Sequence, residues 1–137
     1  MMVKMHGNMP SKPLKPPANR HYIAKVTEKS WTKAENTVIE PWVDVKADVA
    51  AVNAGEAIRT GNLFEINGRT YGVESNGTLY PISGSGFHSL DRKAYNALKL
   101  YRKFGDTLRV AEIPDNMGVD SAQREAALKA WKAGGGK

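Results

Sequence analysis

Residues 62–82, NLFEINGRTYGVESNGTLYPI, decide the fold because two Asn-Gly pairs separate short apolar stretches in them. Asn-Gly is the strongest short-range signal for a two-residue hairpin turn, since both residues tolerate a positive φ. Asn67-Gly68 and Asn76-Gly77 therefore predict three antiparallel strands in a meander, at 62–66, 69–73 and 78–82. Pro81 places the third strand at a sheet edge or ends it early.

The residues after the meander predict a loop and then a helix. Residues 83–89, SGSGFHS, are rich in glycine and serine and predict a flexible loop. Ser89 or Asp91 can cap a helix that runs to Phe104 and Gly105. Apolar residues at helical spacing predict its buried face: Leu90, Ala94, Ala97, Leu98, Tyr101 and Phe104.

The C-terminal residues predict two further helices. A short one begins at Asp106 and ends before Pro114. A last one is capped at Asp120 and docks two side chains inward, Leu128 and Trp131. Residues 134–137, GGGK, predict a frayed tail.

The N-terminal residues predict an arm, a strand and a helix. Residues 1–20 contain four of the seven prolines, lack apolar periodicity and predict a disordered basic arm. Residues 21–28, HYIAKVTE, alternate as a strand does, and residues 44–54 carry valines at helical spacing before Gly55. The whole predicts one α+β domain over 21–133. Its small antiparallel sheet is the meander plus this N-terminal strand, with helices on one face.

The net charge of +6 is a property of the N-terminal region. Residues 1–33 hold seven basic side chains and one acidic one, whereas the rest of the 137-residue chain holds thirteen of each. That rest divides again, because 34–74 are mainly acidic and 75–137 mainly basic. A basic chain suggests nucleic-acid binding. The regional count places the predicted binding surface in the second half of the chain.

Composition excludes several classes of protein. The chain has no cysteine, so it has no disulfide scaffold, thiolate nucleophile or zinc site with sulfur ligands. No apolar run is long enough to span a bilayer, and residues 1–17 lack the apolar core of a signal peptide. We expect a cytoplasmic protein, acting in a target cell if it is delivered there.

His88 is the centre of the predicted site. Gly84 and Gly86 let backbone N–H groups turn toward a ligand just before a helix N-terminus, which favours an anion there. Arg92 can bind a phosphate with two donors, and imidazole transfers protons near neutral pH. The preceding strands complete a catalytic set resembling a metal-free ribonuclease site: His88, Arg92, Glu74, Tyr80 and Tyr71.

Basic and loop residues around His88 predict phosphate binding. The loop and the helix face supply the candidates Ser85, Gly86, Ser89, Lys93, Lys99 and Lys103. Each feature has a plain structural alternative. A histidine before a helix can be a cap or a packing residue, Ser-Gly-Ser-Gly can be an ordinary connector, and a basic helix face can simply be solvated. No metal site or cofactor is expected, because histidines and carboxylates do not cluster at ligand spacing.

The stretch 67–104, with Asn-Gly hairpins followed by a Gly-rich loop and His-x-Leu-Asp-Arg, resembles C-terminal effector domains of bacterial polymorphic toxins. These are the contact-dependent inhibition and Rhs types. The resemblance implies a small nuclease that an acidic immunity protein neutralises, with His88 and Arg92 as its leading catalytic residues.

Three hypotheses follow. The first is a metal-independent nuclease, acting on RNA rather than DNA, with His88 as general acid/base and Arg92 on the phosphate. The second is a non-catalytic binding or assembly module that contacts an acidic protein or a nucleic acid. The third is a transferase or glycohydrolase acting on a nucleotide such as NAD.

Overall fold

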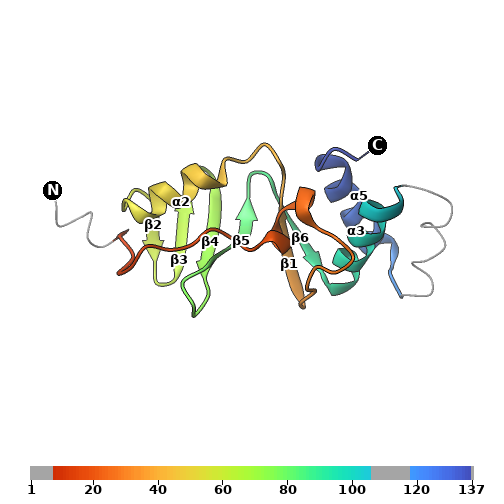
Figure 1. Cartoon of the computed structure of the whole chain (residues 1–137), viewed down its shortest axis with the longest axis horizontal. Coiled ribbons are helices and arrows are strands. Elements are labelled where there is room, and N and C mark those ends of the chain that lie inside the picture. The colour runs from red at the N-terminus through yellow and green to blue at the C-terminus, as the bar shows by residue number, and fades with distance from the viewer. Residues whose placement is uncertain (1–7, 106–117, 137) are drawn as a thin grey trace. The chain divides into compact units, whose positions relative to one another are not determined.

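The computed structural model describes residues 8–105 and 118–136, and it has an α+β fold (Figure 1). The described residues form two compact units. Unit 1 contains residues 8–18 and 42–87, and unit 2 contains residues 19–41, 88–105 and 118–136. We predicted one domain over 21–133, and the structure divides that range between the two units.

The meander is the centre of unit 1. Four antiparallel strands lie in the order β2 (Ile58–Thr60), β3 (Leu63–Ile66), β4 (Arg69–Val73) and β5 (Leu79–Gly84). The turn between β3 and β4 has φ angles of 54° at Asn67 and 77° at Gly68, as the Asn-Gly pair predicts. The edge position predicted for the Pro81 strand is confirmed, since β5 is at the end of the sheet. Strand β2 was not predicted.

One helix covers the buried face of this sheet. Helix α2 (Val45–Asn53) is capped by Asp44, whose carboxylate accepts a hydrogen bond from Ala47 N, and it confirms the predicted helix. The core between helix and sheet consists of Val52, Ala57, Phe64, Tyr71 and Leu79. The alternation of side chains along β3 and β4 explains why Phe64 and Tyr71, which pair across the strands, both enter it.

The expected disordered arm is wrong for its described part. Residues 8–18, which we call the N-terminal strap, run along unit 1 (Figure 1). Main-chain hydrogen bonds hold the strap there. Lys15 N donates to Gly77 O and Leu79 N donates to Lys15 O, at 2.9 Å each. The strap therefore extends unit 1 beside the start of β5. Residues 1–7 lie outside the described residues.

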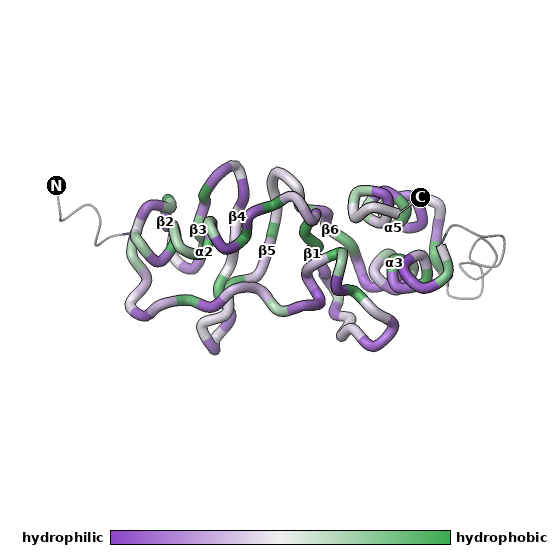
Figure 2. The backbone as a smooth tube through the Cα atoms, turned by 45° about the horizontal axis from the view of Figure 1, so that its top comes forward, coloured by the Kyte–Doolittle hydropathy of each residue, from purple (hydrophilic) through white to green (hydrophobic). Residues whose placement is uncertain are grey.

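Unit 2 contains a two-stranded antiparallel sheet and two helices. Strand β1 (Glu35–Ile39) pairs with β6 (Phe87–Asp91), whose first residue belongs to unit 1. Helix α3 (Arg92–Phe104) packs against α5 (Ser121–Ala133), and hydrophobic and hydrophilic residues alternate along α3 in Figure 2. Asp91 and Asp120 cap these helices, which confirms two predicted helix starts.

The core of unit 2 joins both helices to the sheet. Leu90, Leu98 and Tyr101 are buried, as the helical spacing predicts, and the Tyr101 ring stacks on Trp131 at 5.7 Å between centroids. Phe104 and Leu128 pack against this core and are partly buried. The helix predicted from Asp106 to Pro114 lies outside the described residues.

Three local predictions for this part of the chain are wrong. Residues 21–28 form no strand, because the chain makes two 3-10 turns, η1 (Asn19–His21) and η2 (Ile23–Lys25). Residues 83–89 are not a loop, since β5 continues to Gly84 and β6 begins at Phe87. The tail is not frayed over 134–136, because Gly136 N donates to Trp131 O at 3.0 Å.

Candidate functional site

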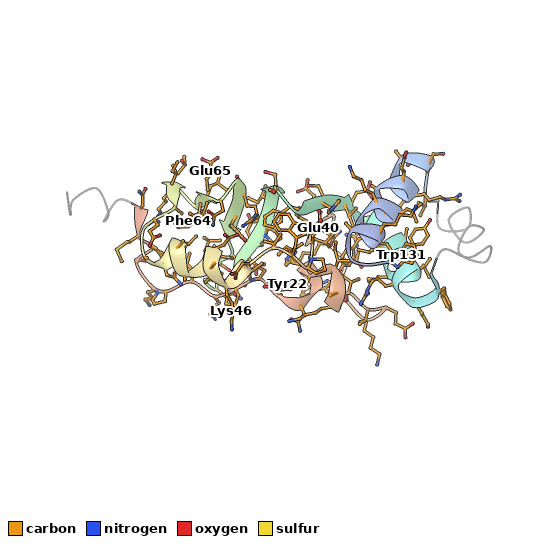
Figure 3. All side chains as sticks on the ribbon, turned by 90° about the horizontal axis from the view of Figure 1, so that it is seen from above. Tyr22, Glu40, Lys46, Phe64, Glu65 and Trp131 are labelled. Carbon is orange, nitrogen blue, oxygen red and sulfur yellow. The ribbon has the colours of Figure 1, made fainter. Side chains whose placement is uncertain are left out.

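His88 is hydrogen-bonded to a carboxylate. Its Nε2 lies 2.8 Å from Oε2 of Glu40. His88 is in β6, and Glu40, labelled in Figure 3, directly follows β1, so the pairing of these two strands brings the side chains together. The side chains are 14% and 22% exposed. The pair is therefore ordered by its surroundings and still reached by solvent.

The pair has the chemistry of a proton-transfer site. When Nε2–H donates to Glu40, the second ring nitrogen, Nδ1, carries the lone pair that can accept a proton. The carboxylate fixes the ring orientation and stabilises an imidazolium that forms next to it. Sequence analysis missed Glu40, because it lies 48 residues before His88 in the chain.

Arg92 is an exposed residue in the first turn of α3. Its Nη1 donates to the backbone oxygen of Thr32 at 3.4 Å, at the long limit of a hydrogen bond. Arg92 belongs to the same unit as His88, and its guanidinium retains donors that face solvent.

The basic face of α3 mainly holds the segment 24–32 in place. Lys99 donates to the Thr32 hydroxyl, Lys103 pairs with Glu28, and Arg102 donates to the backbone oxygens of Ala24 and Val26. Burial, followed by the nearby Arg20 charge, lowers the pKa of Lys99. These three side chains therefore have structural partners. Lys93 also has one, since it donates to the backbone oxygen of Gly118, but this contact is exposed.

The glycines of the 83–86 segment are explained by close packing. A Cβ on Gly84, whose φ is +126°, would lie 2.3 Å from the backbone oxygen of Gly68. Ser85 N donates to that same oxygen, and a Cβ on Gly86 would meet Val43 and Trp42. In this arrangement Ser85 N–H binds the neighbouring hairpin turn rather than facing a ligand.

The three candidates from the meander are in unit 1 and have contacts of their own. Tyr71 is fully buried and donates to Asp48 Oδ2 at 2.6 Å, and its pKa is raised by burial and by that hydrogen bond. Because solvent does not reach it, Tyr71 is a packing residue in this structure. Tyr80 covers Gly72, where a Cβ would lie 2.4 Å from the Tyr80 ring. Glu74 is half-buried and lines a hollow described below.

Sequence reasoning also missed a buried charge cluster centred on Asp48. The Asp48 carboxylate, 0% exposed, accepts hydrogen bonds from Asn67, from Tyr71 and twice from Arg69. Burial alone would raise the pKa of Asp48, but these hydrogen bonds outweigh burial and hold that pKa below its ordinary value. An acidic residue on the same helix face as Val45 and Val52 was the available signal.

Within residues 8–105 and 118–136, no group of three or more His, Asp or Glu side chains is placed to bind a metal. The helices in these ranges are too short or too polar to cross a membrane. Comparison with protein-family models, curated proteins and solved structures found no match to this chain.

Proposed function

We propose that this protein is a metal-independent ribonuclease in which His88 acts as the general base and Glu40 orients it. The observation that carries this proposal is the 2.8 Å hydrogen bond between His88 Nε2 and Glu40 Oε2, in a pair that solvent reaches. A histidine held by a carboxylate is an effective proton acceptor, because the ring is fixed and its cationic form is stabilised.

The proposed reaction needs one proton acceptor and one cation. His88 Nδ1 removes the proton of a ribose 2′-hydroxyl, and the 2′-oxygen attacks the adjacent phosphorus. The bond to the 5′-oxygen breaks, that oxygen takes a proton from water, and the products carry a 2′,3′-cyclic phosphate and a 5′-hydroxyl. Arg92, in the first turn after β6, is the candidate for binding the phosphate oxygens.

The test is cleavage of a fluorescently labelled single-stranded RNA by the full chain. His88→Ala should lower the rate by roughly 10²–10⁴-fold, the usual contribution of a positioned acid or base. Glu40→Gln should also lower it and should change its pH dependence, because the charge next to the ring is lost. Glu125→Gln removes an exposed carboxylate of α5 and serves as the matched control.

The same assay separates this proposal from its alternatives. A substrate with a single 2′-deoxyribose at the scissile position should resist cleavage, and a chelator should leave the rate unchanged. Full activity of His88→Ala, with a melting temperature equal to that of the wild type, would rule out His88 as the general base. Binding of RNA by the wild type without any turnover would favour the non-catalytic binding module.

The resemblance to polymorphic toxin domains adds a biological expectation to the proposal. A ribonuclease of this kind should arrest growth when it is expressed inside bacteria, and an acidic immunity protein should relieve the arrest. Expression of the wild type and of His88→Ala under one inducible promoter tests this. Equal growth of the two cultures, at equal protein levels, would argue against a toxin.

A further inference from the structure

A hollow of about 450 Å³ lies in unit 1 between the N-terminal strap and the turn that precedes β5. Its polar lining includes Lys12, Lys15, Arg59, Glu74, Ser75 and Asn76. Leu14, Phe64 and Val73 add apolar surface. This volume is within the range of small-ligand sites, which are commonly 300–1,000 Å³.

The strap side of the hollow is held in place at several points. Leu14 N donates to Asn53 Oδ1 at 2.8 Å, and Asn53 Nδ2 donates back to Leu14 O at 3.1 Å. Lys15 pairs through its main chain with Gly77 and Leu79. Lys12 and Lys15 thus lie on a fixed backbone, and the entropy of ordering that backbone is lost on folding rather than on binding.

Arg59, which is in β2 and also lines the hollow, is held in a similar way. Its Nε donates to Gly61 O at 3.0 Å and its Nη1 donates to Met9 O at 2.8 Å. The guanidinium also lies over the Phe64 ring, 5.4 Å from its centroid. Within the part of the chain that the structure describes, Arg59 Nη2 has no hydrogen-bond partner, so this donor is positioned and unused.

The charges that line the hollow do not balance. Three cations face one acid, Glu74, and the salt bridges among the described residues include none of these four side chains. This contrasts with Arg69 and Lys103, each of which is paired with a carboxylate in the same structure. The excess of positive charge in this lining is unfavourable, and an anion bound in the hollow would offset it.

We propose that this hollow binds a phosphate group, with Lys12, Lys15 and Arg59 as its ligands. Arg59 presents a planar donor group and the two lysines present compact charges, a combination that suits the tetrahedral oxygens of a phosphate. The phosphate can belong to a free nucleotide or to a nucleic-acid backbone. The inference goes beyond the proposed function and does not depend on it, since it involves neither His88 nor Glu40.

The experiment measures binding by the full chain with three probes. Inorganic phosphate and uridine monophosphate are titrated by NMR, following the backbone amides of residues 12, 14, 15 and 74–77. A fluorescein-labelled 2′-O-methyl oligouridine is titrated by fluorescence anisotropy at several salt concentrations. The 2′-O-methyl groups prevent cleavage through the 2′-oxygen, so the result is the same whether or not the protein is a ribonuclease.

Two double variants are compared with the wild type. Lys12→Ala/Lys15→Ala removes two of the three proposed ligands and leaves the main-chain pairing of Lys15 intact. Lys129→Ala/Lys132→Ala removes two exposed lysines of α5 at the same three-residue spacing, with the same change in net charge. Thermal melting of both variants establishes that they fold.

The first variant should bind roughly tenfold more weakly, the scale of two exposed ion pairs, whereas the control should bind as the wild type does. With the oligouridine, the slope of log K against log salt should fall by about 1.4, or about 0.7 for each lost phosphate contact on a single strand. Binding of uridine monophosphate identifies a nucleotide site, and binding of the oligomer alone identifies a backbone site. Equal loss in the two variants, or no binding of any probe, would overturn the proposal.

Discussion

His21 makes the stability of unit 2 depend on pH in a way that the structure specifies. The ring is 6% exposed, and its Nδ1 lies 2.8 Å from the backbone oxygen of Thr37, to which Nδ1–H donates. Burial lowers the pKa of His21 from 6.5 to about 4, against an opposing effect of the Thr37 hydrogen bond. The positive charges of Arg20 and Lys33 lower it further.

The sign and size of the effect follow from linkage. A histidine whose pKa is lowered by folding takes up a proton more readily when unfolded, so stability falls as the pH falls from 6.5 toward 4. Between pH 7 and pH 4.5 the two pKa values imply that roughly 2–3 kcal/mol of stability is lost, at about 1.4 kcal/mol per pKa unit. Carboxylates with lowered pKa values, such as Asp91, lose their contribution to stability mainly below pH 4.5.

The assay is urea unfolding followed by tryptophan fluorescence at pH 7.0, 5.5 and 4.5. The wild type and His21→Gln are compared, because glutamine keeps a donor for Thr37 and does not titrate. Over this range the wild type should lose roughly 2–3 kcal/mol of unfolding free energy relative to His21→Gln. An NMR titration of the His21 ring that gave a midpoint near 6.5, or identical pH dependence of the two proteins, would refute the reasoning.

Three further substitutions test the packing described above, each by urea unfolding. Asp48→Asn should lower the free energy of unfolding by about 3–5 kcal/mol, because Arg69 stays buried without its counter-charge. Glu65→Gln, which changes an exposed carboxylate, is the control. Equal unfolding midpoints of the two variants would contradict the role of the Asp48 cluster. Gly84→Ala should lower the free energy of unfolding more than Gly61→Ala does, since a Cβ at Gly84 meets backbone atoms and one at Gly61 meets nothing within 4 Å. The reverse order would argue against this packing. Asp91→Ala should cost about 1 kcal/mol through loss of the α3 cap, and an unchanged midpoint would show that the cap contributes nothing.

The parts of the fold that were predicted correctly have strong local signals. The turn at Asn67-Gly68 requires positive φ angles that these residues tolerate, and α3 combines an N-cap with an apolar face. Residues 21–28 lack such a signal. Their alternation of apolar residues also suits two 3-10 turns that bury Ile23 and Val26, three residues apart.

The candidate site was predicted only in part, for a related reason. His88 was selected for its chemistry, but its partner depends on the pairing of β1 with β6, and neither strand was predicted. Gly84 illustrates the opposite error. Gly84 was expected to turn backbone N–H groups toward a ligand, whereas the structure explains this glycine by the close approach of the Gly68 backbone. Long-range contacts of this kind leave no periodic trace in a sequence.

The division of the chain between the two units has a consequence for synthesis on the ribosome. Most of unit 1 is one continuous segment, residues 42–87, and the strap that completes it is made earlier. Unit 1 can therefore close as soon as β5 has left the exit tunnel. Strand β1, although made before it, has no paired strand until β6 emerges, and Val38 lacks its core neighbour Leu90 during that interval. Slow translation after residue 87 would lengthen this interval, whereas slow translation before residue 42 would not.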